Sequence, residues 1–213
     1  WTTDGKIGWK NEDVEAFFTM LMAMQDDRSI QPPSELAEED TKPMDQSAMA
    51  GGRVAMTFLW SNQVKAMDAA SGKKMKILRP PAASGTPKWL WYKASMLWSA
   101  SAKTKNPEAV AKFVNYLANS PEAGQIMGTE RGVPANKDVR AAIEPKLSDV
   151  DKKVVAYLDS IESELGPTPL VTPVGGGNFG TIQMRMVQDL IFGRKTPIEA
   201  ATGLHDEVKA QLK

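Results

Sequence analysis

The 213-residue sequence is 42% hydrophobic and 24% charged, which is the composition of an ordinary globular protein. It has 26 basic and 26 acidic residues, so no net electrostatic field points to nucleic acid or to a membrane surface as a partner. It has no cysteine and a single histidine, His205. Disulfides, thiolate chemistry and a metal site built from several histidines are therefore excluded, and we expect neither a metal nor a cofactor.

The first part of the chain alternates helical and strand-like patterns. Asp4-Gly5 predicts the turn of a hairpin over residues 1–9, and a helix with an apolar stripe should follow from Asn11 to Met24. The acidic segment 26–43 is typical of a loop. Residues 53–60 and 75–78 predict short buried strands, and the helix between them should end at Gly72.

A strand followed by a capped helix occupies the middle of the chain. Residues 95–100 form a short, mostly apolar run, which favours a buried strand. Asn106 can cap the helix that follows, with Pro107 at its first position. One face of this helix is predicted to be core, and its residues recur at helical spacing: Val110, Phe113, Val114 and Leu117.

Helices dominate the second half. Starts are predicted at Pro121, at Asn136 and near Ser148. A connector rich in proline and glycine spans 166–178, and a helix should run from about Phe179 to Phe192. The final helix begins with a capping box, Thr196 to Glu199. The pattern is α/β with few strands and many helices.

Several phrases, in this order, resemble one family. They are WTTDGK, MAGGRVAMTFLWSN, KILRPPAASG, SASAKTKNPEAVAKFVNYLANSPEAGQIM, RGVPANKDV and FGRKTPIEAATGLHDEVKAQL. Together they are similar to the extracellular, periplasmic-type solute-binding proteins of ABC sugar transporters (family 1). The order and spacing of the phrases across nearly the whole chain make the resemblance specific for the family.

The resemblance implies a type II periplasmic-binding-protein fold, which has two α/β lobes with the ligand in the cleft between them. Family members are about twice this long, so the chain should correspond to their C-terminal half and its fold should be incomplete. The expected division is residues 1–94 in the C-terminal lobe, 95–168 as a hinge crossing with N-terminal-lobe helices, and 169–213 crossing back to the C-terminal lobe. The missing N-terminal part would hold the signal or lipid anchor, and the uncovered lobe could be buried in a domain-swapped homodimer.

The resemblance also implies a sugar ligand, whose apolar ring face stacks on tryptophan while polar groups take its hydroxyls. Trp60, at a predicted strand-to-helix turn, and nearby Asn62 are candidates, and Trp60 could equally be core. Trp89 and Trp91 should share one face of a strand, with Tyr92 on the other, as a stacking platform or as core.

The glycine-rich phrase before the helix at 179 is a second candidate. No lysine and hydroxyl pair follows Gly175–Gly177 as in a P-loop, so a nucleotide site is disfavoured. We expect a loop lining the cleft, with Gly176, Gly177, Asn178 and Phe179 near the sugar. The alternative is a flexible crossing.

The predicted function is carbohydrate binding in the cleft, without catalysis, and delivery to the permease subunits of an ABC importer outside the cytoplasm. Three alternatives stay open. The chain could belong to a carbohydrate-active enzyme with acids at Asp4 and in residues 35–40, bind a non-sugar solute, or form a helical interaction module over residues 107–213.

Overall fold

The computed structural model describes residues 1–39, 41–81, 90–93 and 96–212, and the chain divides into two units. The first unit combines Trp1–Ala48 with Pro169–Lys213, and the second is Met49–Thr168. The chain therefore leaves the first unit at 48–49 and returns at 168–169. The boundary at 94–95 predicted from the sequence lies inside the second unit, and the assignment of segments to lobes stays a prediction.

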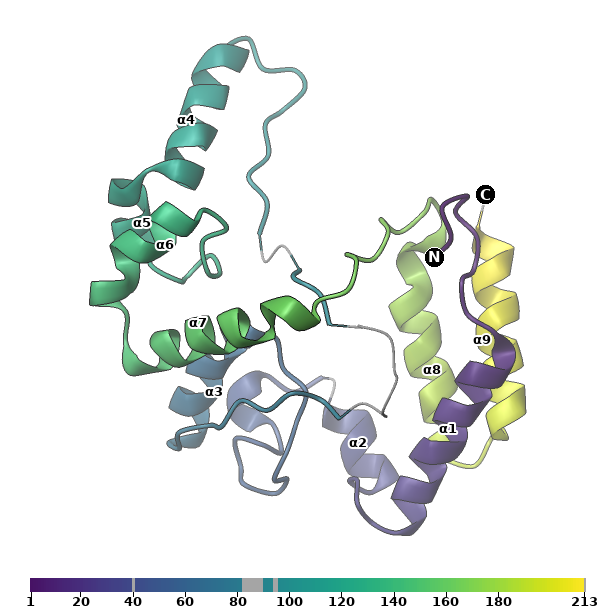
Figure 1. The fold of residues 1–213 in the computed structure, drawn as a ribbon. Helices are drawn as coiled ribbons and strands as arrows, with labels where there is room; N and C mark the ends of the chain where they lie inside the picture. Colours follow the sequence, from purple (N-terminus) through teal and green to yellow (C-terminus); the bar gives the residue numbers. More distant parts are fainter. Residues whose placement is uncertain (40, 82–89, 94–95, 213) are drawn as a thin grey trace. The chain divides into compact units, whose positions relative to one another are not determined.

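Three helices side by side form the first unit (Figure 1): α1 (Asn11–Asp26), α8 (Phe179–Ile191) and α9 (Pro197–Gln211). The predicted capping box is confirmed at α9, where Thr196 Oγ1 accepts from the backbone N–H of Glu199 and the Glu199 carboxylate accepts from the N–H of Thr196. A helix lies where the sequence predicted a loop, because α2 (Pro33–Glu39) starts at the second of two prolines. Single 3₁₀ turns cover Met44–Gln46 and Gly176–Asn178.

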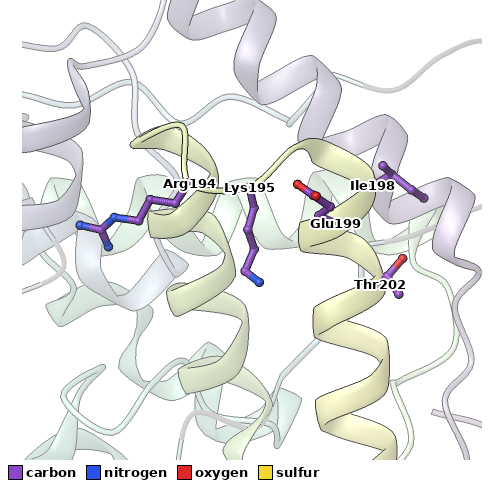
Figure 2. Close-up of a pocket in the computed structure, with 5 residues that line it drawn as sticks. All are labelled: Arg194, Lys195, Ile198, Glu199 and Thr202. Atoms are coloured by element: carbon purple, nitrogen blue, oxygen red, sulfur yellow. The ribbon is translucent and has the colours of Figure 1, made fainter.

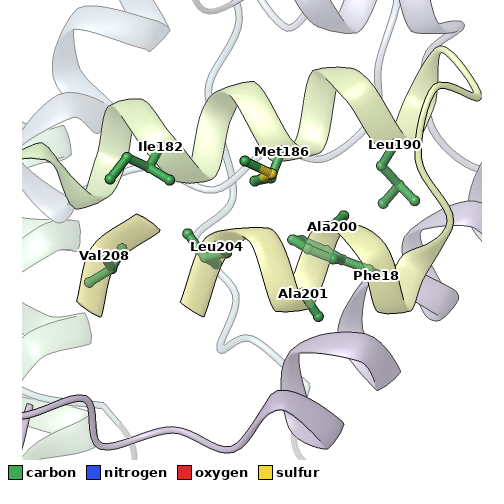
Figure 3. Close-up of a cluster of buried hydrophobic side chains, with 8 residues drawn as sticks. All are labelled: Phe18, Ile182, Met186, Leu190, Ala200, Ala201, Leu204 and Val208. Atoms are coloured by element: carbon green, nitrogen blue, oxygen red, sulfur yellow. The ribbon is translucent and has the colours of Figure 1, made fainter. Parts of the chain in front are cut away.

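The core of this unit lies between α1, α8 and α9 (Figure 3). Phe18 of α1 is 1% exposed and packs among side chains of the two C-terminal helices. Small residues keep α9 close to α8, since a Cβ on Gly203 would stand 3.1 Å from Met186 Sδ. The buried set is Phe18, Ile182, Met186, Leu190, Ala200, Ala201, Leu204 and Val208.

The N-terminal turn is present, without the predicted hairpin strands. The N–H of Gly5 donates to the carbonyl of Thr2 at 3.0 Å, and the N–H of Thr2 donates to the carbonyl of Lys6 at 3.0 Å. Gly5 has φ +77°, which a residue with a side chain rarely adopts. The flanking residues form no ladder, so the predicted hairpin is reduced to its turn.

The second unit is built from short helices. They are 3₁₀ Ser61–Gln63, α3 (Val64–Ser71), α4 (Pro107–Asn119), α5 (Pro121–Met127), α6 (Lys137–Ile143), 3₁₀ Glu144–Lys146, α7 (Asp149–Ile161) and 3₁₀ Glu162–Glu164. Most predicted boundaries are confirmed. Ser120, Asn136 and Ser148 accept N-cap hydrogen bonds, and Gly72 ends α3 at φ +64°.

Two helix pairs organise the second unit. In the first, α5 packs on α6, and Gly124 sits so close to Val139 that an added Cβ would stand 2.3 Å from Val139 Cγ1. In the second, α3 packs on α7. Val139 and Ile143, together with Leu147, form a small buried cluster.

The predicted strands do not form in the described residues, where the structure has one isolated parallel bridge, Leu90 to Leu165. Residues 53–60, 75–78 and 96–100 are not paired in a ladder, and Ser95 lies outside the described residues. The predicted buried strands are also exposed, as Phe58 is 82% and Leu97 79% accessible. A strand needs a neighbour to satisfy its backbone and cover its side chains, and these segments have none among the described residues.

The predicted core face of α4 is likewise not buried. Phe113 is 61% exposed, and Val110, Val114 and Leu117 are only half-buried. The helix itself forms with Pro107 at its first position as predicted, because helical periodicity is a local property, but the Asn106 side chain makes no cap hydrogen bond. Burial of its face requires a second layer, and α4 packs mainly on the short helix α5.

None of the helices in the described ranges is both long and apolar enough to cross a membrane.

We predict opposite effects for two Gly→Ala substitutions within helices. Gly124→Ala should lower the free energy of unfolding of the second unit by about 1–3 kcal/mol, because the new methyl overlaps the stiff Val139 side chain. Gly180→Ala is the matched control. No atom lies within 4 Å of its added Cβ, so it should stabilise α8 by about 0.5–1 kcal/mol. Urea unfolding followed by circular dichroism measures both, and equal stabilisation by the two variants would contradict the close contact.

Candidate functional site

Trp60 stands at the start of the 3₁₀ turn that leads into α3. Its φ and ψ are −70° and 145°, so the chain is extended up to this residue and helical after it. Gln63 fixes the turn, since its Oε1 accepts from the backbone N–H of Trp60 at 2.9 Å and its own N–H donates to the carbonyl of Trp60 at 2.8 Å. Trp60 as a whole is 48% exposed. The sequence predicted the turn and its position correctly.

A second segment, residues 90–93, makes hydrogen bonds to α7 and to the residues that follow it. Leu90 and Leu165 form the parallel bridge, and the N–H of Gly166 donates to the carbonyl of Leu90 at 2.8 Å. The hydroxyl of Tyr92 donates to the carbonyl of Leu158 at 2.7 Å. Burial and the nearby carboxylate of Glu162 raise the pKa of this phenol, so it remains a proton donor.

Trp60, Trp91 and Lys93 meet in what we call the aromatic corner. The Trp60 and Trp91 ring centroids are 6.3 Å apart with planes at 76°, an edge-to-face contact. The Lys93 ammonium lies over the Trp60 ring, 4.3 Å from its centroid. Because side chains alternate along an extended chain, Trp91 and Lys93 reach the same side while Tyr92 points to α7.

Two further residues, Asn62 and Trp89, were predicted to belong to this site. Asn62 is exposed, two residues beyond Trp60. Trp89 lies outside the described residues. Lys93 was missed by the sequence analysis, although its place two residues after Trp91 was a signal that both side chains share one side of the segment.

The second predicted group lies in the first unit and packs against the chain's two ends. Gly176 is buried beneath Trp1, whose ring carbons would stand 3.0–3.1 Å from an added Cβ. Asn178 Nδ2 donates to Gln211 Oε1 at 2.9 Å, at the end of α9. Gly177 is exposed, and an added Cβ there would meet no atom within 4 Å.

Phe179 belongs to an aromatic cluster with two tryptophans. Its ring centroid is 5.3 Å from that of Trp9 and 6.1 Å from that of Trp1, and the two tryptophans are 5.7 Å apart. These contacts give Gly176, Asn178 and Phe179 packing roles, and ligand contact by Gly176–Phe179 stays a prediction.

A surface hollow of about 440 Å³ lies at the turn between α8 and α9 (Figure 2). Arg194, Lys195 and Glu199 line it with Ile198 and Thr202, and none of these was a predicted site residue. Glu199 is engaged in capping α9 and Arg194 lies 3.5 Å from Asp189. The hollow lacks an aromatic ring on which a sugar could stack.

Of the acidic residues of the enzyme alternative, Asp4, Glu38 and Glu39 have structural partners, and Asp40 lies outside the described residues. Hydrogen bonds from Lys6 and Thr2 lower the pKa of Asp4 to about 2, which leaves it ionised and unsuited to act as a general acid. Glu38 pairs with Lys42 at 3.1 Å, and Glu39 accepts from the N–H of Ala48 at 2.7 Å. In the described part of the chain no three His, Cys, Asp or Glu side chains are grouped so that they could hold a metal.

Asp151 is a buried acid with a structural role. Its carboxylate accepts from Thr129 Oγ1 at 2.7 Å and from Ser148 Oγ at 2.5 Å, and it lies 3.6 Å from Lys65 of α3. Burial alone would raise the pKa of Asp151, but the bonds from Ser148 and Thr129 and the charge of Lys65 outweigh it and lower the pKa. The carboxylate thus ties α7 to α3, the helix that follows Trp60.

Comparison with known proteins gives the class. Residues 1–154 match the family of bacterial extracellular solute-binding proteins. The match covers well over half of the sequence, so the chain belongs to this family.

Solved structures agree on the fold. An extracellular solute-binding protein of family 1 from Alicyclobacillus acidocaldarius subsp. acidocaldarius DSM 446 superposes with a TM-score of 0.84 at 22% identity. The similarity covers 99% of this chain and 54% of that one. A de novo designed cysteine esterase superposes with a TM-score of 0.78 at 22% identity, covering 97% of this chain and 52% of that one.

These matches confirm the predicted family and the helix-rich, incomplete binding-protein fold. The chain spans about half the length of both structural relatives. At this identity the structural similarity shows the fold alone, so the ligand must be argued from the residues of this chain.

We predict that Gly176→Ala and Gly177→Ala will separate packing from ligand contact. Gly176→Ala should destabilise the first unit by about 1–3 kcal/mol, because its methyl would overlap Trp1. Gly177→Ala should leave the unfolding midpoint nearly unchanged and weaken solute binding if this loop lines the cleft. Thermal unfolding and ligand titration of both variants check this, and unchanged binding by Gly177→Ala would remove this glycine from the site.

Asp151 should give the second unit a pH-dependent stability. Its pKa is lowered on folding, so its contribution is present above the unfolded value of about 3.9 and is lost as pH falls through the lower folded value. Asp151→Asn should cost about 1–3 kcal/mol at neutral pH and flatten the acid limb of the stability profile. Urea unfolding between pH 2 and 7 measures this, and an unchanged acid limb would contradict the assignment.

Proposed function

We propose that the chain carries part of the binding surface of a carbohydrate-binding subunit of an ABC importer. The observation that carries the proposal is the aromatic corner, where Trp60 is half exposed and Trp91 supports it edge-on. An indole face offers a flat apolar surface to the C–H face of a sugar ring. The 3₁₀ turn at Ser61–Gln63 places polar side chains, including Asn62, directly after the ring.

The protein would act by binding and not by catalysis. The two lobes would close about a hinge when the sugar binds, so the closed conformation would occur with ligand bound. The permease subunits would recognise that conformation. A protein with this function would work in the periplasm or outside the cell. The transporter would hold it near the membrane, or a lipid anchor would do so in the N-terminal part that family members have before the region matched here. Membership of an extracellular solute-binding family supports this location.

Several exposed apolar side chains in the second unit favour coverage by more polypeptide. Met56 is 77% exposed, and Ile126 is 80% exposed. In a structural relative of nearly twice the length, 46% of the chain lies outside the similarity and could supply that cover. A domain-swapped homodimer of residues 1–213 stays a prediction.

The enzyme alternative has less support. Asp4 is an ionised, exposed carboxylate with a pKa of about 2, and Glu38 and Glu39 have structural partners. A glycosidase would release product from an oligosaccharide, whereas a binding protein gives saturable binding without turnover. For a non-sugar solute, that solute would bind while no sugar does.

Substitutions in the corner test the proposal. Trp60→Ala and Trp91→Ala should each weaken sugar binding by about 10–100-fold, because a stacking surface is lost. Trp98→Ala is the matched control, since Trp98 is also half exposed but has no place in the corner, and it should leave affinity unchanged. Calorimetry and tryptophan fluorescence against a panel of mono- and oligosaccharides measure these effects.

Two outcomes would overturn the proposal. One is that no sugar in the panel binds while another class of solute does. The other is that Trp98→Ala lowers affinity as much as Trp60→Ala, which would mean that the corner has no special part in binding.

A further inference from the structure

Lys93 gives the aromatic corner a positive charge, and the binding of a neutral sugar does not require one. Its ammonium lies 4.3 Å from the centroid of the Trp60 ring, on the side of the extended segment that also carries Trp91. We propose that the ligand of this site is an anionic saccharide, with Lys93 as the residue that binds its acidic group. The inference rests on the proposed function and narrows its substrate class.

Lys93 differs in its charge pairing from two other lysines of the second unit. Among the described residues it makes no ion pair, whereas Lys65 pairs with Asp151 and Lys137 with Glu162. Its ammonium contacts the face of Trp60, a weak attraction at an exposed position. An ammonium has three N–H donors, and contact with a ring face does not give them hydrogen-bond acceptors. Lys93 can therefore still donate hydrogen bonds to an anion.

The arrangement of Trp60 and Lys93 suits a sugar ring that carries a negatively charged substituent. A sugar stacked on Trp60 presents its substituents around the edge of the indole, and a carboxylate or sulfate on that edge comes within reach of the flexible Lys93 side chain. Such an anion would draw the ammonium off the ring face and form a charge-assisted hydrogen bond. A neutral sugar would gain only a hydrogen bond from Lys93 to a hydroxyl oxygen, without the added attraction of opposite charges, and would have to share the indole with it.

The anion could be the carboxylate of a uronate or the sulfate of a sulfated sugar, so both are tested. The probes are oligogalacturonate, oligomannuronate and sulfated galactan oligosaccharides. Fully methyl-esterified oligogalacturonate is the neutral control, since it keeps the stereochemistry and removes the charge. Calorimetry at low and high salt gives the affinities.

We expect at least one acidic probe to bind about tenfold more tightly than its neutral counterpart, the effect of one charge-assisted hydrogen bond. Lys93→Met, which keeps an apolar stem over Trp60, should remove that preference by weakening the acidic ligand more than the neutral one. Lys93→Arg should retain it. Lys103→Met replaces another exposed lysine of the same unit and should change nothing. Added salt should weaken acidic ligands only.

The outcomes separate this inference from the proposed function. Equal binding of neutral and acidic sugars, with both dependent on Trp60, would overturn the anionic ligand and leave carbohydrate binding intact. A preference for acidic sugars that survives Lys93→Met would also overturn it, because the charge would be read elsewhere. If no sugar binds, acidic or neutral, both fail together.

Discussion

The first unit depends on one packing contact, the insertion of Phe18 of α1 among the buried side chains of α8 and α9 (Figure 3). These helices come from opposite ends of the sequence, so the contact closes the chain on itself across more than 160 positions. The same two segments, residues 1–48 and 169–213, also meet in the aromatic cluster of Trp1, Trp9 and Phe179. Small residues in α9 make the contact possible, since Ala200 and Ala201 are fully buried where larger side chains would push the helices apart.

Helices were predictable from the sequence because their signals are local. Asn136, Ser148 and the pair Thr196 and Glu199 cap the helices that they were expected to cap. Strands were not predictable in the same way, because an apolar run such as 53–60 becomes a strand only when another strand pairs with it. In the described residues that neighbour is absent, and Phe58 is exposed instead of buried.

The candidate site shows the same division between local and distant information. Trp60 was found from the strand-to-helix turn, which is a local pattern. Its meeting with Trp91 joins positions 31 residues apart in the sequence, and no spacing rule predicts it. Lys93 entered the site only through that meeting. The packing of Gly176 under Trp1 was hidden for the same reason, because Trp1 lies far from it in sequence.

The bridge between Leu90 and Leu165 links the aromatic corner to the backbone that leaves the second unit. Trp91 follows one partner of the bridge, and three residues after the other partner the chain reaches the boundary at 168–169. The bridge is made by the main chain, with the N–H of Gly166 donating to the carbonyl of Leu90 at 2.8 Å. If Trp91 contacts the ligand as proposed, a displacement of its backbone would reach residue 165 through this bridge, three residues before the chain leaves the second unit.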